Sequence, residues 1–401
     1  MFAVTHEADP LHAPMLPPEH LMVMPPETAS LFRTLRGAGY ATGMSGKWHI
    51  AHHYNSVPLK KRDDGRYFDA YGIDFVGDAN NGHAEKDKSI DAITADGIAF
   101  IERNRDRPFI AYLAHHAPHA PMEAPKALVE KYAARGFKRS SSPLSVTAER
   151  PTADYAAMLD HLDAGVGRVL AKLDELGLTK NTVVIFASDN GGLGRMADMA
   201  PLRESKGAPY EGGLRVPFLA RWPGHIAPGS VSAVPIHAVD YYPTFVALAG
   251  TTAPAGPRLD GENLVPLLTG QGSLRRDTLY WHRPTYTAMY GRTPCAVVRR
   301  GEWKLIHYFG DFLDTTGQLP MHNSLYGRLV LGARTELYHV TQDISEVRDV
   351  AAVESARVKE LSTALEAFLA ETKALLPQTN PAFRADNPDW WRLPQRGGGE
   401  P

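Results

Sequence analysis

The feature that most restricts the fold is an amphipathic helix followed at once by a buried strand. Apolar residues recur at intervals of three and four, which predicts one buried helix face made of Tyr155, Leu159, Leu162, Val166, Val169, Leu173 and Leu176. Gly177 is placed to cap this helix, and residues 181–188 are rich in β-branched and aromatic side chains, which predicts a fully buried strand. A helix joined so closely to a buried strand is typical of α/β folds.

The same design recurs along the chain. Residues 109–114 predict a second buried strand, which follows an amphipathic helix around residues 90–101, and residues 216–222 predict a third strand. Repeated alternation of this kind favours an α/β fold in which a largely parallel sheet lies between helices.

The C-terminal third has a different pattern. Residues 297–309 and 335–340 predict strands of a small antiparallel sheet, and residues 355–376 predict a helix packed on it. We therefore expect a main domain over residues 1–269 and a smaller C-terminal α+β subdomain over residues 270–401, which contains this sheet, the helix and a tail.

Composition excludes several classes of function. The net charge is −2, so the chain has no basic field that would attract nucleic acid. Its apolar runs are too short to span a bilayer, and the first residues lack the charged start and apolar stretch of an export signal. We expect no nucleic-acid partner and no membrane span, and the compartment stays open.

The stretch FASDNGG, residues 186–192, places an acid and an amide directly after a predicted strand. Asp189 and Asn190 both offer side-chain oxygens, which suit a hard cation such as Ca²⁺ or Mg²⁺. Asp, Asn and Gly are also common in turns, so these residues alone favour a plain turn at the strand end over a cation site.

Three further stretches carry candidate site residues. Lys47 and His49 are two residues apart in SGKWH, so in an extended backbone both point to one side, where they suit an anionic group. Prolines on both sides of His119 would hold its imidazole at a fixed angle, and glycines around Lys206 indicate a shaped loop. The alternatives are solvated lysines and structural histidines.

These stretches, in this order, resemble the sulfatase family of the alkaline-phosphatase-like fold. The resemblance runs through GYATGMSGKWH, PFIAYLAHHAPHAP, the strand ending in SDNGG, SKGAPYEGGLRVP and LDGENLVPLL, and it covers about residues 26 to 353. It implies a sulfuric ester hydrolase that acts on a small-molecule or carbohydrate sulfate ester.

The resemblance also implies roles for individual residues. Asp189 and Asn190 match half of a divalent-cation site, commonly occupied by Ca²⁺, with Mg²⁺ as the alternative. Lys47 and Lys206 match sulfate-binding lysines. His49 matches the histidine near the nucleophile, and His119 matches the histidine that protonates the leaving oxygen. General acid catalysis and charge stabilisation by cations are the chemistry that these side chains can supply.

Two family elements are missing from the sequence. Family members begin with an apolar strand that ends in two metal-binding aspartates, followed by a C-x-P-S-R motif whose cysteine becomes formylglycine, the nucleophile. The pair Asp63-Asp64 follows KKR rather than an apolar run, and Cys295 lacks the motif around it. We therefore expect Met1 to be an internal methionine of a longer sulfatase, and the 401-residue chain itself to be inactive or a fragment.

Other interpretations stay open at this point. The chain could be a degenerate, non-catalytic member that binds anions through Lys47 and Lys206. It could also be a phosphodiesterase or phosphonate hydrolase of the same superfamily, although relatives that handle phosphate with two metals tend to carry His where Asn190 stands. An intact relative could be exported to the periplasm or secreted.

Overall fold

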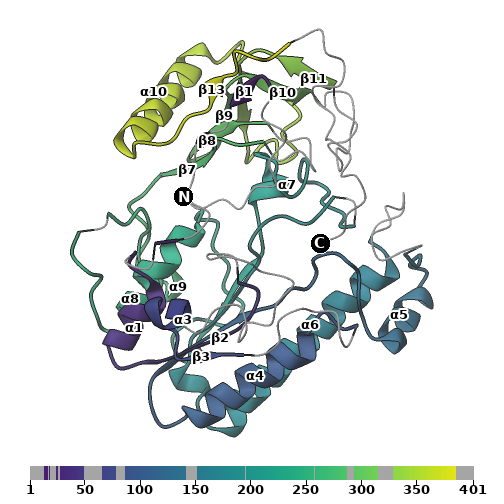
Figure 1. Cartoon of the computed structure of the whole chain (residues 1–401), viewed down its shortest axis with the longest axis vertical. Helices are drawn as coiled ribbons and strands as arrows, with labels where there is room; N and C mark the ends of the chain where they lie inside the picture. The colour runs from purple at the N-terminus through teal and green to yellow at the C-terminus, as the bar shows by residue number, and fades with distance from the viewer. Residues whose placement is uncertain are drawn as a thin grey trace.

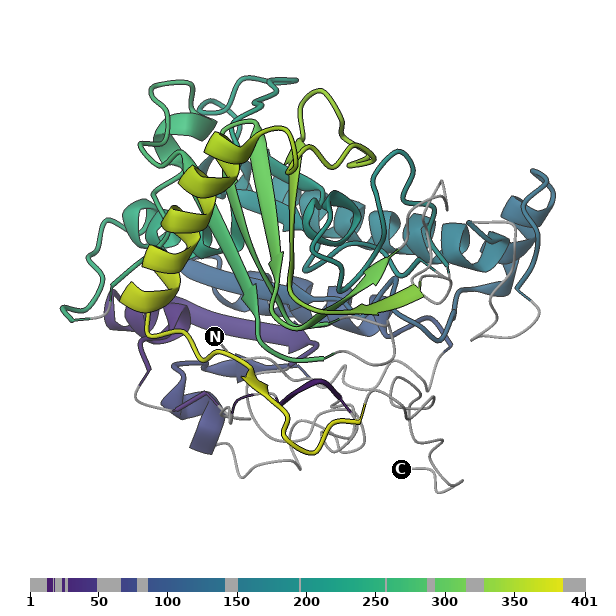
Figure 2. The same cartoon turned by 90° about the horizontal axis from the view of Figure 1, so that it is seen from above.

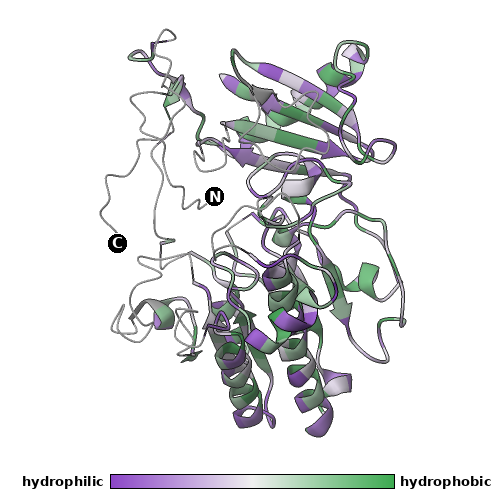
Figure 3. Cartoon of the chain, turned by 90° about the vertical axis from the view of Figure 1, so that its right-hand side faces the viewer, coloured by the Kyte–Doolittle hydropathy of each residue, from purple (hydrophilic) through white to green (hydrophobic). Residues whose placement is uncertain are grey.

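The structure is a computed structural model that describes residues 13–16, 18, 24–25, 28–48, 66–77, 86–140, 151–194, 196–256, 258–286, 293–314 and 328–384. An α/β part is followed by a C-terminal antiparallel sheet. Helices α4 and α6 lie at one end of the long axis, and helix α10 with its sheet lies at the other (Figure 1). The same two blocks are visible from the side, where both carry apolar residues in their strands (Figure 3).

In chain order the main elements of the α/β part are α1 (Leu31–Gly37), β2 (Ala41–Gly46), α3 (Arg66–Ala70), β3 (Phe75–Val76), α4 (Ile90–Arg103), β4 (Phe109–Ala114), α5 (Lys126–Ala133), α6 (Ala153–Glu175), β5 (Val184–Ala187), α7 (Glu211–Leu214), β6 (Phe218–Arg221), α8 (Tyr241–Leu248) and α9 (Val265–Leu268). Strand β2 is buried along its whole length and pairs in parallel with β3 and β4. Parallel pairing of buried strands between helices is the predicted arrangement.

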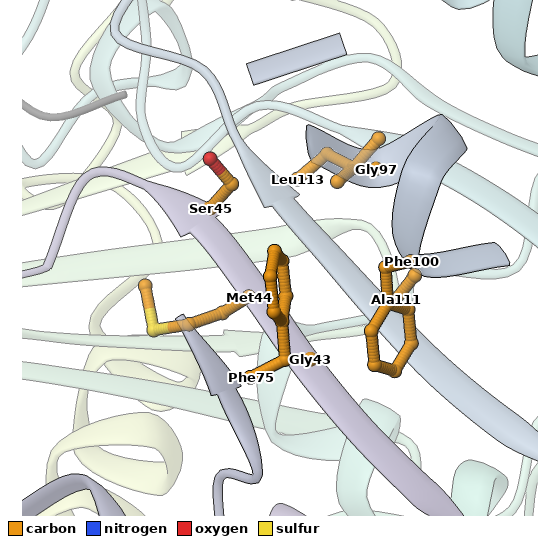
Figure 4. Close-up of a pocket in the computed structure, with 8 residues that line it drawn as sticks. All are labelled: Gly43, Met44, Ser45, Phe75, Gly97, Phe100, Ala111 and Leu113. Carbon is orange, nitrogen blue, oxygen red and sulfur yellow. The ribbon is translucent and has the colours of Figure 1, made fainter. Parts of the chain in front are cut away.

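Helix α4 packs closely on this sheet because glycines remove side chains from the interface. A Cβ at Gly97 of α4 would lie 2.6 Å from Leu113 Cδ1 of β4, and one at Gly43 of β2 would lie 2.6 Å from Phe100 Cε2 of α4. Figure 4 shows these residues facing one another between the helix and the strands. The contact is an apolar packing interface.

Helix α6 begins and ends close to its predicted bounds, but its buried face differs from the predicted one. Thr152 caps the helix, and Gly177 follows it with φ +67°. Leu159 is exposed, whereas Ala157 and Gly165 are buried. A Cβ at Gly165 would lie 2.8 Å from Thr94 Oγ1 of α4, so small residues let the two helices approach, and this turns the buried face away from Leu159.

Strands β5 and β6 form a separate antiparallel pair, and β5 is shorter and less buried than predicted. Within the described ranges β4 pairs only with β2 and β5 only with β6, so each has one edge without a strand partner. Phe186 is 38% exposed, Leu219 is 61% exposed and Tyr112 on β4 is 52% exposed. These strands therefore lack the cover that makes β2 fully buried.

The elements of the C-terminal part are β7 (Thr278–Arg283), β8 (Cys295–Arg300), β9 (Trp303–Tyr308), β10 (Asp311–Asp314), β11 (Arg328–Leu331), β12 (Arg334–His339), α10 (Ser355–Glu371) and β13 (Gln378–Thr379). Four strands form an antiparallel sheet in the order β12-β9-β8-β7, and α10 lies across one face of it (Figure 2). The small antiparallel sheet and its helix agree with the prediction, while the division at residue 269 stays a prediction.

Two short pairs complete the described structure. Strand β10 pairs with β11, and β1 (Met15–Leu16) pairs with β13, so residues near the start of the chain lie against residues near its end. Among the described residues, no helix is both long enough and apolar enough to span a membrane.

Candidate active site

The turn after β5 carries Asp189 and Asn190, and its glycines fit it tightly against a second loop. A Cβ at Gly191 would lie only 1.8 Å from the carbonyl oxygen of Gly212. The Gly191 amide donates to Gly213 O at 3.1 Å. A glycine is therefore required at Gly191 by the close approach of the neighbouring backbone.

That second loop, residues 203–213, carries Lys206 and is called the Lys206 loop below. The Lys206 amide donates to Gly192 O at 2.9 Å, which fixes the loop directly beside the Asp189 turn. Burial lowers the pKa of Lys206, the positive charge of Lys47 lowers it further, and Asp189 raises it. All three charged side chains therefore act on one another across a single site.

Lys47 reaches the same turn from the end of β2. Its amide continues the parallel pairing by donating to Ala114 O of β4 at 2.7 Å, and its Nζ lies 4.0 Å from Asp189 Oδ2. The Asp189 side chain is 69% exposed, so the carboxylate faces an open surface beside the two lysines. The ends of β2 and β5 thus bring Lys47 and Asp189, two of the predicted site residues, close to each other.

His119 comes from the loop after β4, and one of its ring nitrogens is fixed. Its Nδ1 lies 2.7 Å from Ala120 O, and because a carbonyl only accepts, Nδ1 carries the hydrogen. Although the residue reaches solvent, partial burial lowers its pKa; the Ala120 contact raises it, and Lys206, Lys47 and Lys88 lower it. The Nε2 atom is left to exchange a proton.

His49, the remaining predicted residue, lies outside the described residues.

The sequence interpretation missed Lys88, whose Nζ lies 3.8 Å from Glu123 Oε2, with both side chains largely buried. Burial lowers the pKa of Lys88 to about 8, opposed by the charge of Glu123. A lysine before a helix is expected to be solvated, so the sequence held no signal for this pair.

A second group of ligand-type side chains consists of Asp87 and Asp91 at the start of α4, together with His161 of α6. The carboxylate of Asp87 accepts from the amides of Ser89 at 2.9 Å and Asp91 at 3.0 Å, so it caps the helix. Asp91 also forms an ion pair with Arg168. Asp87 and Asp91 therefore stabilise the start of α4, and His161 Nε2 lies 3.4 Å from Asp91 Oδ2. The group is distinct from the predicted pair at Asp189 and Asn190.

The chemistry of the Asp189 turn fits a hard divalent cation in part. Carboxylate and amide oxygens are the right donor type, and the exposed carboxylate can turn toward an ion. Ca²⁺ usually takes about six to eight oxygens. Two side chains alone would therefore supply only part of the ligands that such an ion takes.

Comparison with known proteins decides the family. A family model for sulfatases matches residues 3–251, and a model of the N-sulphoglucosamine sulphohydrolase C-terminal region matches residues 205–316. The chain belongs to the sulfatase family. The predicted family is thereby confirmed, and metal-dependent sulfuric ester hydrolysis is the activity that the membership supports.

Curated relatives agree with this result. The chain is 29% identical over 403 residues to a sulfatase from Formosa agariphila, covering 84% of this chain and 68% of the relative. It is 30% identical over 365 residues to human arylsulfatase A, covering 80% and 67%. It is 30% identical over 304 residues to human N-acetylgalactosamine-6-sulfatase, covering 67% and 53%. The similarity therefore spans between 53% and 68% of the length of these relatives.

Solved structures confirm the predicted fold. A protein solved with its substrate D-glucosamine-2-N,6-O-disulfate matches with a TM-score of 0.62 at 20% identity, covering 93% of this chain and 90% of that one. The phosphonate monoester hydrolase of Agrobacterium radiobacter matches with a TM-score of 0.56 at 20% identity, covering 87% and 81%. At these identities the likeness shows the alkaline-phosphatase-like fold alone.

Proposed function

We propose that Lys47, Lys206, His119, Asp189 and Asn190 form the sulfate-ester site of this sulfatase. The observation that carries the proposal is the convergence of two strand ends and one loop. Lys47 Nζ lies 4.0 Å from the Asp189 carboxylate, and the Lys206 amide is bonded to Gly192 O in the same turn. Two ammonium groups beside an open carboxylate suit an anion that binds together with a cation.

In this site each side chain has a role that follows from its charge and its donor atoms. Lys47 and Lys206 would bind the sulfuryl oxygens and stabilise the negative charge that develops on them. Asp189 and Asn190 would hold Ca²⁺, or Mg²⁺, which when bound would act as a Lewis acid on a sulfuryl oxygen. His119, with Nδ1 fixed on Ala120 O, would deliver a proton from Nε2 to the leaving oxygen. His49 is proposed to lie near the nucleophile.

We further propose a sulfated carbohydrate as the substrate. Two similar proteins support this: human N-acetylgalactosamine-6-sulfatase, and the structure that contains D-glucosamine-2-N,6-O-disulfate. The proposed site lies at an open surface, where the Asp189 side chain is 69% exposed. An exposed site of this kind leaves room for the rest of a sugar chain.

The test is calorimetric titration of the chain with inorganic sulfate in the presence of Ca²⁺. Lys206→Met should weaken sulfate binding about tenfold or more, because a hydrogen bond to a charged group contributes roughly 1.5–3 kcal/mol. Lys126→Met, at an 86% exposed lysine of α5, is the matched control and should leave affinity unchanged. Equal affinities in the wild type and Lys206→Met would refute the assignment, and methylphosphonate in place of sulfate tests the phosphonate alternative.

A further inference from the structure

A lysine of the C-terminal sheet is buried between two carboxylates. Lys304 lies on β9 and its side chain is 0% exposed. Its Nζ lies 3.0 Å from Glu211 Oε1 and 2.8 Å from Glu346 Oε1. A buried ammonium group is costly unless it is paired, so these two contacts fix where both carboxylates lie.

Glu211 is held at two points. It begins the short helix α7 at the end of the Lys206 loop, and its backbone amide donates to Glu346 Oε2 at 2.6 Å. Burial alone would raise the pKa of Glu211, but Lys304 and Arg299 hold it below its ordinary value, so the group stays a carboxylate. The side chain and the backbone of Glu211 are thus both fastened to the C-terminal part.

The loop itself rests on the same sheet. Ala208 and Tyr210 belong to an apolar cluster with residues of the C-terminal strands, on the face opposite α10. Arg203 donates to Tyr338 Oη at 2.9 Å and to Glu346 O at 2.7 Å. Both ends of the Lys206 loop are therefore attached to the sheet.

From Glu211 the contacts lead directly to the proposed sulfate site. The backbone amide of the next residue, Gly212, donates to Arg203 O at 2.8 Å. The Gly212 carbonyl oxygen lies so close to Gly191 of the Asp189 turn that a Cβ there would be only 1.8 Å from it. Lys206 is in turn bonded to Gly192 O. A shift of Glu211 would therefore move the backbone that carries Lys206 and the backbone that carries Asp189.

We propose that Lys304 is a positioning residue of the sulfate site, which acts through Glu211 to hold the Lys206 loop against the Asp189 turn. The C-terminal sheet thereby sets the geometry of a site whose proposed residues lie in the α/β part. The inference rests on the proposed roles of Lys206 and Asp189.

The experiment compares amide hydrogen exchange in the wild type, Lys304→Met and Leu365→Ala. Lys304→Met keeps an unbranched side chain one atom shorter than lysine and removes the charge. Leu365 lies in the buried cluster between the sheet and α10, so Leu365→Ala weakens the C-terminal part without touching the Lys206 loop. Both variants are measured at a temperature at which circular dichroism shows them fully folded.

Lys304→Met should speed exchange at the amides of Gly191, Lys206 and Gly212 about tenfold or more, by local opening, whereas Leu365→Ala should leave these amides unchanged. Sulfate affinity should fall in Lys304→Met alone. Equal effects of the two variants would show that Lys304 matters only for stability, and no effect in Lys304→Met would overturn the proposal outright.

A second variant covers the case in which Lys304→Met does not fold. Glu211→Gln keeps the size of the side chain and removes the charge that Lys304 holds, so it should speed exchange at the same three amides; unchanged exchange there would overturn the proposal. The two readouts also separate the hypotheses. A wild type that binds no sulfate would refute the proposed site, while amide exchange would still decide whether Lys304 holds the loop.

Discussion

At the scale of single residues, the pKa of His119 depends on its burial and on the cations around it. Partial burial lowers its pKa, and Lys206, Lys47 and Lys88 lower it further, against the opposing bond to Ala120 O. The free site therefore keeps the imidazole neutral near neutral pH. A bound sulfate group would offset the positive charge of the lysines, so binding of the anion and uptake of a proton by His119 are linked.

We predict that saturating sulfate raises the pKa of His119. The measurement is an NMR titration of the His119 ring signals with and without sulfate. As a control, Lys206→Met should raise the same pKa in the absence of sulfate, because it removes one of the charges that lower it. An unchanged pKa in both experiments would contradict the placement of His119 beside the anion.

A second prediction concerns His115, whose pKa burial lowers from 6.5 to about 4, with further lowering by Arg168 and His161. Between the folded and the unfolded pKa of His115, the imidazole is protonated in the unfolded chain but stays neutral in the folded protein. The contribution of His115 to the unfolding free energy is therefore fully present above pH 6.5 and is lost as the pH falls toward about 4. The loss in unfolding free energy between about pH 7 and about pH 5 is on the order of 2 kcal/mol.

Urea unfolding at both pH values measures this loss. His115→Gln should reduce the difference in unfolding free energy between the two conditions, because glutamine does not titrate. An equally large difference in the variant would show that other groups cause the acid sensitivity.

At the scale of elements, the contact between α4 and β4 depends on a missing side chain. Gly97→Ala would place a Cβ 2.6 Å from Leu113 Cδ1, so we predict a loss of roughly 1–3 kcal/mol in unfolding free energy. Gly167→Ala in α6 is the matched control, since a Cβ there has no neighbour within 4 Å. It should stabilise the protein by about 0.5–1 kcal/mol, and chemical denaturation of both variants checks the opposite signs.

The sequence was sufficient to predict elements whose burial is decided locally. The buried residues of α4 include Ile90, Ile93 and Ile101, as their spacing indicates, and α10 begins at the predicted residue. Long-range geometry was not predictable. The buried face of α6 turns toward small residues that fit α4, and β5 pairs antiparallel with β6, which depends on where the chain returns.

Part of the candidate site could be predicted from the sequence, and part could not. Lys47, Asp189 and Lys206 were predicted because ordered motifs marked them, and the structure brings their strand ends and loop together. Lys304 and Lys88 were not, since a lysine is expected to be exposed, and only the folded chain shows which carboxylates bury it.

At the scale of the whole molecule, the Lys206 loop joins the α/β part to the C-terminal sheet. Its apolar residues pack on the sheet, and its backbone is bonded to the Asp189 turn. The proposed site residues therefore lie in the α/β part, and the C-terminal sheet supports the loop that carries one of them. A change in the contacts between this loop and the sheet should therefore reach the proposed sulfate site.

The most direct test of the account is the affinity for inorganic sulfate measured by calorimetry with and without Ca²⁺, in the wild type and in Asp189→Ala. Because Asp189 and Asn190 supply few of the oxygens that Ca²⁺ takes, we expect weak binding of the ion, yet a bound cation should strengthen sulfate binding at Lys47 and Lys206. The account predicts that Ca²⁺ increases the sulfate affinity of the wild type and has no effect in Asp189→Ala. The same sulfate affinity of the wild type with and without Ca²⁺ would contradict it.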